Sequence, residues 1–224
     1  MKLLRQIPLA LLCVSVACPS LWAQTPEKPE SDTAKQSAPL DDSLYRKLVD
    51  RIKGGDLTVD FVQLRDSFGA WLCNEKVKTD APNRAAMVSA FEKKDYAKAV
   101  ELVEPVLDYE FVHIGLHRAA AEAYGNLGLA QKADFHKNIA EKLQKALLSS
   151  GDGKTPETAF RVLTVREEYV IMNELGYEVQ MQALLAIKGK SYDRLSGKDK
   201  KTDQAVSVYF DISSFFGGCE RVRK

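Results

Sequence analysis

The period of the apolar residues changes from about 3.6 to 2 near Ser149, and no other feature of the sequence constrains the fold as much. Up to that point, apolar residues recur at helical spacing. Beyond it, apolar and polar residues alternate over 177–187 and again near the C-terminus, as they do in strands with one buried face. A chain with helices first and strands afterwards is typical of an α+β protein. We therefore predict one α+β domain over residues 41–220, with a helical part, 41–150, followed by a small antiparallel sheet with one helix, 151–220.

The sheet part is predicted to begin with a short strand over 160–165 and a helix over 166–175, which Gly176 ends. The next strand is expected to bury one face, made of Tyr177, Val179, Met181, Ala183, Leu185 and Ile187. A return strand follows, and residues 196–203, which are polar and basic, are predicted to form a hairpin tip before the last strand.

The helical part is predicted to contain two helical hairpins between residues 82 and 148. Their helices are separated at 93–95, 108–110 and 127–129. Ala99 and Ala133 lie 34 residues apart, which is the length of a tetratricopeptide repeat, and residues 124–128 resemble part of that repeat's first helix. Two units are fewer than a solenoid usually needs, so we predict a tetratricopeptide-like block and not a repeat array.

The first 23 residues have the pattern of a secretory signal peptide. Lys2 and Arg5 precede an apolar run over 7–17, and Ala23 offers a small residue for cleavage. An uncleaved membrane anchor and a lipoprotein cleaved before Cys18 are the alternatives. Cleavage after Ala23 would remove two basic residues and no acidic one, so the formal net charge of +1 would become −1.

Residues 24–40 are rich in proline and polar side chains and are predicted to be a disordered linker. With the signal peptide, this linker predicts a protein of the periplasm or one that is secreted, without a stable membrane span after cleavage. The 32 basic and 31 acidic residues leave no basic surplus, which argues against a nucleic-acid partner.

Only Cys73 and Cys219 would remain after cleavage. In an oxidising compartment they could form a disulfide that joins the start of the domain to its end, or they could be two buried thiols. Neither is part of a Cys-x-x-Cys pair, so the sequence predicts no zinc site and no redox motif. We predict no cofactor.

Three histidines lie in the helical part. His113 and His117 are four residues apart, which would place them on one helix face. If the two helices of the second hairpin pack antiparallel about Gly128, His117 and His136 come within about one turn of each other. This pair could bind a metal ion or act in acid–base chemistry with Glu167 or Glu168 as the added carboxylate. The alternative is a hydrogen-bonded pair with a structural role.

Further acidic residues complete the candidate polar cluster of His117, His136, Asp152, Glu167, Glu168 and Asp193. Asp152 lies in Gly151-Asp-Gly-Lys-Thr155, which lacks the first glycine of a phosphate loop and follows a helix, so it predicts a turn or a cation ligand and not a nucleotide site. Thr164 and Glu167 have the spacing of a capping box, and carboxylates are favourable at a helix N-terminus. Asp193 is predicted on a strand, either in a polar groove or on a solvated sheet face.

Four stretches of the chain resemble one family of secreted bacterial proteins, known only as a domain of unknown function, number forty-nine nineteen. They are Asp60-Phe61-x-x-Leu64-Arg65; His117 with Ala133-x-x-His136; the glycine-rich segment 150–160; and Glu167-Glu168-Tyr169 with Tyr192-Asp193 and Val208-Tyr209-Phe210. The resemblance covers roughly residues 44–217. Phe68 departs from it, since a tyrosine is expected there. The resemblance implies a fold and a secreted location, but no activity.

Two functions are compatible with these observations. The first is a protein- or peptide-interaction module of the cell envelope, with an envelope protein or peptide as its partner. The alternative is a small metal-binding protein or enzyme centred on His117 and His136, with Asp152 and Glu167 or Glu168. The second requires these side chains to converge in one cleft.

Overall fold

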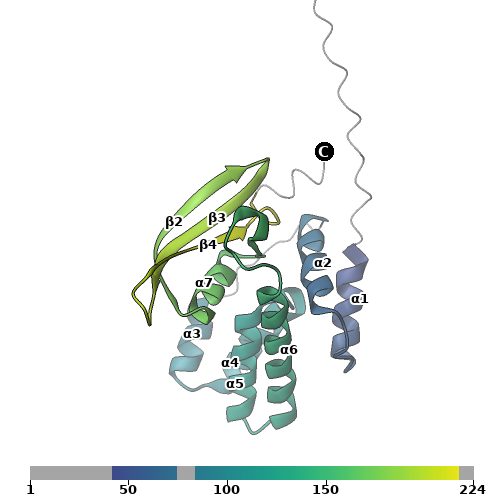
Figure 1. Cartoon of the computed structure of the whole chain (residues 1–224). Coiled ribbons are helices and arrows are strands. Elements are labelled where there is room, and N and C mark those ends of the chain that lie inside the picture. The colour runs from purple at the N-terminus through teal and green to yellow at the C-terminus, as the bar shows by residue number, and fades with distance from the viewer. Residues whose placement is uncertain (1–41, 75–83, 217–224) are drawn as a thin grey trace, which may run out of the picture. The chain divides into compact units, whose positions relative to one another are not determined.

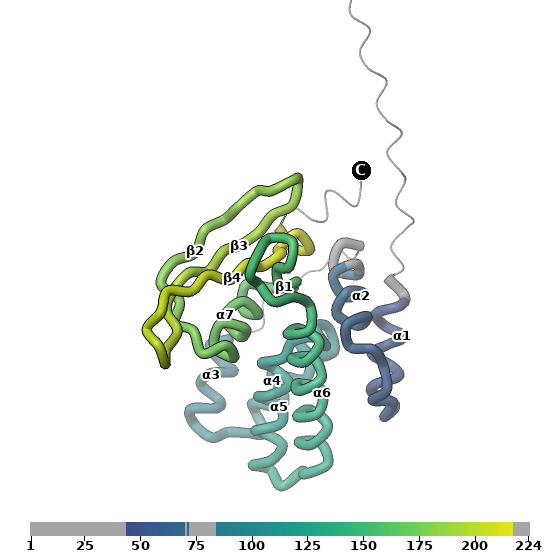
Figure 2. Tube along the Cα trace, viewed as in Figure 1, coloured from purple at the N-terminus to yellow at the C-terminus, as the bar shows by residue number. Residues whose placement is uncertain are grey.

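The order of elements follows the change of period in the sequence. The structure, a computed structural model, describes residues 42–74 and 84–216, without the side chains of 42, 43, 70 and 72–74. Within these residues the helices are α1 (Asp42–Lys53), α2 (Phe61–Asn74), α3 (Arg84–Glu92), α4 (Tyr96–Tyr109), α5 (Ile114–Asn126), α6 (Ala130–Leu148) and α7 (Val165–Glu174), with a 3-10 turn, η1 (Pro156–Thr158). The strands are β1 (Phe160–Arg161), β2 (Tyr177–Ile187), β3 (Lys190–Asp199) and β4 (Ala205–Asp211). The predicted α+β class is confirmed (Figures 1 and 2).

Capping side chains and a glycine turn define several helix boundaries. The Asp95 carboxylate accepts a hydrogen bond from the backbone N–H of Lys98 and caps α4, and the Asp60 carboxylate caps α2 in the same way through Val62. Gly128 has a φ of +73° in the turn between α5 and α6, a conformation that suits glycine. The helix breaks predicted from the sequence therefore lie at these turns.

Neighbouring helices of the chain pack against each other. Contacts join α3 to α4, α4 to α5, and α5 to α6, while α1 packs on α2 and α2 on α6 (Figure 1). The largest buried side chains include Tyr45, Trp71, Phe111 and Leu143, which belong to one apolar core. The two predicted hairpins are present, whereas their relationship to tetratricopeptide repeats stays a prediction.

The four strands form one sheet in the order β1-β4-β3-β2. β2 pairs antiparallel with β3, β3 pairs antiparallel with β4, and the two-residue β1 pairs parallel with β4. α7 packs against β2. Leu195, Val208 and Phe210 belong to the main core. The strand order places β2 at one edge of the sheet.

The predicted alternation of burial along β2 is present except at Met181, but a β-bulge divides the predicted residues between the two faces of the sheet. The register shifts between Val179 and Met181. Tyr177 and Val179 pack against the core, but Met181 is 63% exposed, and Ala183, Leu185 and Ile187 lie on its face of the sheet. Gly197 opposite the bulge permits this approach, since a Cβ there would lie 1.7 Å from the Glu178 carbonyl oxygen.

Two further boundaries differ from the prediction. β3 continues to Asp199 and takes in the first half of the predicted hairpin tip at 196–203, because Gly197 and its neighbours pair with both β2 and β4. β1 ends at Arg161 and not at residue 165, because the chain turns there into α7.

Several predictions fall outside the described residues. These are the signal peptide over 1–23, the linker over 24–40, Cys219, and the side chain of Cys73, so the disulfide stays a prediction. In the part of the chain that the structure describes, no helix has the length and apolar character needed to cross a bilayer.

Candidate functional site

Two buried histidines and one glutamate form a chain of hydrogen bonds across three helices. α5 places His117 and α6 places His136 so that their Nδ1 atoms lie 2.9 Å apart. The Nε2 of His117 lies 2.7 Å from the Phe111 carbonyl oxygen. The Nε2 of His136 lies 3.2 Å from Oε1 of Glu104 on α4, which also accepts the Tyr124 hydroxyl at 2.8 Å. The predicted proximity of the two imidazoles is therefore confirmed.

The partners of His117 and His136 fix where their protons lie. A carbonyl oxygen only accepts, so His117 carries its proton on Nε2 and accepts on Nδ1. The Nδ1 of His136 must then donate to His117. The remaining nitrogen of His136 faces a carboxylate oxygen, and two lone pairs in contact would repel each other. A proton therefore lies between His136 and Glu104, either on the imidazole or on the carboxyl group.

Burial and hydrogen bonding divide the charge between these groups. Burial lowers the pKa of His117 to about 3, so this imidazole is neutral at neutral pH. The hydrogen bond from His136 is the largest cause that lowers the pKa of Glu104, and the Tyr124 hydroxyl acts in the same direction. The arrangement thus favours an ionised Glu104, with His117 as a neutral support.

A cavity of about 340 Å³ opens beside His136. It is lined by Lys53, Glu104, Leu107, Asp108, Phe111, Phe135 and His136. The Nζ of Lys53 lies 2.5 Å from Oδ1 of Asp108 at this site. The end of the hydrogen-bond chain at Glu104 is therefore accessible from a cavity of small-molecule size.

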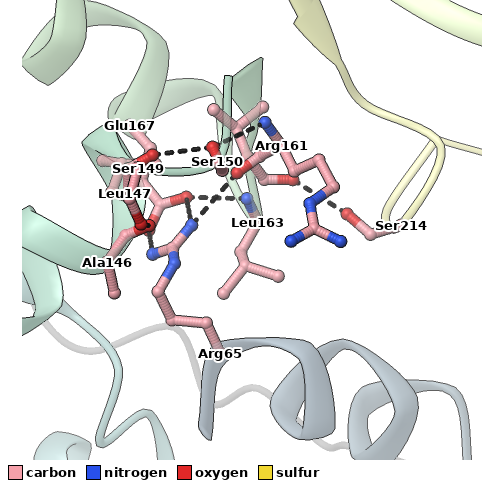
Figure 3. A network of polar contacts seen from close by, with 10 residues as sticks. Arg65, Ala146, Leu147, Ser149, Ser150, Arg161, Leu163, Glu167 and Ser214 are labelled. Atoms are coloured by element: carbon pink, nitrogen blue, oxygen red, sulfur yellow. Dashed lines mark hydrogen bonds and ion pairs between the residues drawn. The ribbon is translucent and has the colours of Figure 1, made fainter. Parts of the chain in front are cut away.

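Glu167 lies in a second polar network, where it binds Arg65. Their side chains form a two-pronged ion pair, with Nη1–Oε1 at 2.5 Å and Nη2–Oε2 at 3.0 Å, and both are buried (Figure 3). Oε2 also accepts the backbone N–H of Leu163 at 2.7 Å. The Thr164 side chain makes no capping bond, so the predicted capping box is wrong, and Glu167 caps the turn before α7 instead.

Glu168 and Asp193 form a third polar site, between α7 and the sheet. Glu168 is 0% exposed, and among the described residues neither of its carboxyl oxygens has a hydrogen-bond partner. The pKa of Glu168 is raised to about 8, chiefly by burial and then by the nearby Asp193 carboxylate. Asp193 accepts a hydrogen bond from Gln182 at 2.7 Å. The predicted solvated face at Asp193 is wrong, because it lies opposite Phe210 on the core side of β3.

Asp152 has a local structural role in its loop. Its Oδ1 accepts the Thr158 hydroxyl at 2.5 Å and the backbone N–H of Lys154 at 3.0 Å, and the side chain is exposed. Gly153, with a φ of +67°, packs against Phe160 and Val208, and its carbonyl accepts from the backbone of β4. The glycine-rich segment thus fastens the loop to the sheet.

The candidate polar cluster is therefore divided among separate sets of contacts. His117 and His136 are together, and so are Glu168 and Asp193, while Glu167 binds Arg65 and Asp152 binds its own loop. Across residues 42–74 and 84–216, no three His, Cys, Asp or Glu side chains are placed to hold a metal ion.

His113 lies apart from His117 in its contacts. It precedes α5 as its N-cap, where Nδ1 lies 3.1 Å from the backbone N of Leu116, and its Nε2 lies 2.8 Å from Arg166. The two histidines are therefore not a pair on one helix face. Sequence reasoning also missed Glu104, whose only signal was its helical spacing from Glu101 and Asp108 on a charged face.

Comparisons with known proteins add a family assignment. No curated protein and no solved structure matches the chain. The model of one family, described as "Domain of unknown function (DUF4919)", matches residues 39–220, which is most of the chain and includes every site described here. The protein therefore belongs to the DUF4919 family.

Proposed function

We propose that this protein is a protein- or peptide-interaction module of the cell envelope, and that it binds an extended segment of another protein along the outer edge of β2. The observation that carries this proposal is the position and composition of that strand. β2 has 11 residues, is the outermost strand of the sheet, and has no strand partner on its outer side among the described residues.

The outer edge of β2 lacks the usual protection against strand pairing. Exposed edges normally carry charged residues or proline, because free N–H and C=O groups recruit other strands. Residues 179–187 contain neither, and the bulge lies at the start of this stretch, between Val179 and Met181. The stretch from Met181 to Ile187 is therefore an uncharged edge, apolar at every position except Gln182, that an added strand can complete.

Exposed apolar side chains flank this edge on both faces. Met181 is 63% exposed on one face, and Leu184, which lies opposite Asp193 on the other face, is 56% exposed. A strand added to β2 places alternate side chains on the two faces and would cover both residues. The expected partner segment is therefore extended, uncharged, and apolar at consecutive positions.

The N-terminal pattern supports a location in the envelope. A signal peptide over 1–23 would direct export, and a polar, proline-rich linker over 24–40 would hold the domain away from the site of attachment or release. The alternative function, a metal-binding protein or enzyme centred on His117 and His136, has less support, because Asp152 and Glu167 make their contacts with other groups.

The test uses photo-crosslinking in the mature chain, from residue 24 onward. A crosslinking residue replaces Met181 in one variant and Leu129, which is 45% exposed between α5 and α6, in a matched control. We expect the first variant alone to crosslink to an extended segment of an envelope protein. A synthetic peptide of that segment should protect β2 amides from hydrogen exchange, and Leu184→Lys should weaken its binding by about tenfold.

Three outcomes would overturn this proposal. They are equal crosslinking from both positions, crosslinking of Met181 only to a second copy of the same chain, and a peptide that binds without protecting β2. Leu127→Lys serves as the control for added charge, because Leu127 is 41% exposed and belongs to the helical part.

A further inference from the structure

Arg194, in the middle of β3, is half-buried and has no partner among the described residues. Its Nε is buried without a hydrogen bond, and no hydrogen bond or ion pair joins its guanidinium to any described residue. The two terminal nitrogens are not buried, so the charged end of the side chain reaches solvent. Buried polar atoms of native proteins nearly always have a partner. The guanidinium of Arg194 is therefore available to a group from another molecule.

Arg194 points to the face of the sheet that lies away from the core. Successive side chains of a strand point to opposite faces, and Leu195, the next residue, belongs to the main core. α7 packs on that core-facing side of the sheet (Figure 1). The pairing register places Ala183 of β2 and Tyr209 of β4 beside Arg194 on the outer face. With the neighbours of Ala183 on this face, they form the outer-face patch of Met181, Ala183, Leu185, Arg194 and Tyr209.

The charge of the outer-face patch is not balanced. Arg194 is the only charged residue of the patch. Asp211, the next acidic residue on this face of β4, is bound by the ammonium of Lys190 at 3.1 Å and by the backbone N–H of Ser213 at 3.0 Å. An anion that reaches the patch therefore meets an unpaired cation and no carboxylate, whereas a second cation would be repelled.

The composition of the outer-face patch is typical of the centre of a protein–protein interface. Tyrosine, methionine and arginine are enriched in such centres, whereas lysine and acidic residues are depleted. Met181 is 63% exposed, and Leu185 and Tyr209 are partly exposed. Ala183 lies between Arg194 and the free edge of β2, so only a short side chain separates the guanidinium from an added strand. The patch is thus continuous with the edge at which we propose strand addition.

We infer that the protein that adds a strand to β2 also lies across the outer-face patch and places the carboxylate of an aspartate or glutamate on Arg194. This inference rests on the proposed function, because the added strand brings the rest of the partner to this face. The segment opposite β2 stays uncharged, and the carboxylate comes from a neighbouring part of the partner that covers β3 and β4. Both terminal nitrogens of Arg194 are available, so the pair can be bidentate, and partial burial strengthens it.

The first experiment places a crosslinking residue at Tyr209, two strands inward from the free edge, in the mature chain. The Met181 and Leu129 variants of the edge experiment are run beside it as reference and control. We expect the Tyr209 and Met181 variants to crosslink to the same envelope protein, and the Leu129 variant not to do so. Mass spectrometry of the crosslinked peptides should place the Tyr209 contact outside the segment held at Met181 and next to an aspartate or glutamate.

The second experiment measures the affinity of that purified partner for matched variants of the mature chain. Arg194→Gln removes the unpaired charge and should weaken binding by about tenfold or more. Arg84→Gln removes an exposed charge on α3 and should bind like the wild type. Arg194→Glu should weaken binding further, and replacement of the partner's acidic residue by lysine should restore it. Arg194 bonds to no described residue, so thermal unfolding of its variants should match that of the wild type.

Two results would overturn this inference and leave the edge proposal intact. One is a Met181 variant that crosslinks to an extended segment while the Tyr209 variant does not reach the same protein. The other is a folded Arg194→Gln variant that binds that protein as tightly as the wild type. If neither Met181 nor Tyr209 crosslinks to a partner, both proposals fail.

Discussion

Replacement of Glu168 by glutamine should stabilise the protein at alkaline pH and remove most of its pH dependence near neutrality. Glu168 is fully buried beside Asp193, and its pKa is raised to about 8 from an ordinary value of 4.5. Between these pH values the folded protein binds a proton that the unfolded chain has released. Stability is therefore greatest below pH 4.5 for this group and decreases as the pH rises toward 8.

The size of the effect follows from the pKa. Each pKa unit corresponds to about 1.4 kcal/mol, so a carboxyl that titrates near 8 when folded should cost about 2 kcal/mol of stability between pH 6.5 and pH 8.5. His117 contributes little to the pH dependence in this window. Its pKa is about 3 in the folded protein and 6.5 in the unfolded chain, so its effect on stability lies mainly below pH 6.5. Glutamine has nearly the same shape and cannot ionise, so Glu168→Gln removes this titration.

The assay is urea unfolding of the mature chain at pH 6.5, 7.5 and 8.5, with Glu168→Gln beside the wild type. We expect the free energy of unfolding of the wild type to decrease by about 2 kcal/mol relative to the variant over this range. Glu174→Gln on the same helix, at a partly exposed position, is the control and should follow the wild type. The reasoning would be refuted if the free energy of unfolding changed equally with pH in the wild type and in Glu168→Gln. Glu168 would then be ionised in the folded protein.

Three further predictions concern other buried groups. Arg65→Met leaves the Glu167 carboxylate buried without its partner and should lower the free energy of unfolding in urea by about 3–5 kcal/mol. The double variant Arg65→Met with Glu167→Met should lower it much less, and equal losses would contradict this account of the ion pair. Gly197→Ala should disrupt the bulge and cost more than about 3 kcal/mol by thermal unfolding, whereas Gly189→Ala, in open space at a φ of +76°, should cost only about 1 kcal/mol. His117 should stay neutral down to about pH 4 in a ¹⁵N NMR titration and should reduce stability as the pH falls from 6.5 toward 3. Protonation near pH 6 would contradict this account, because a fully buried imidazole should resist charging.

Much of the fold could be predicted because its signals are local. The helix breaks at 93–95 and 127–129 depend on neighbouring residues, and the proximity of His117 and His136 follows from antiparallel packing about Gly128. The bulge in β2 could not be predicted in the same way. It depends on Gly197, which lies on another strand, and a shift of one residue exchanges the two faces of a strand.

The grouping of the polar residues into sites also could not be predicted from local sequence patterns. Arg65 and Glu167 are separated by 102 residues, so their pairing depends on how α2 meets the start of α7. Glu104 belongs to α4, whose distance from His136 is set by packing between non-neighbouring helices. Local patterns indicated most of the polar residues of interest, but tertiary packing determines which of them share a site.

The parallel pairing of β1 with β4 has a consequence for the order in which the protein folds. Phe160 pairs with Phe210, so the two segments must meet across the whole of α7, β2 and β3. The helical hairpins and the β2–β3 hairpin are local in the chain and can form early, whereas closing this long loop has a higher entropic cost. The core around Leu195 should therefore close last, once the C-terminal strand is available, and a chain truncated before β4 should remain aggregation-prone.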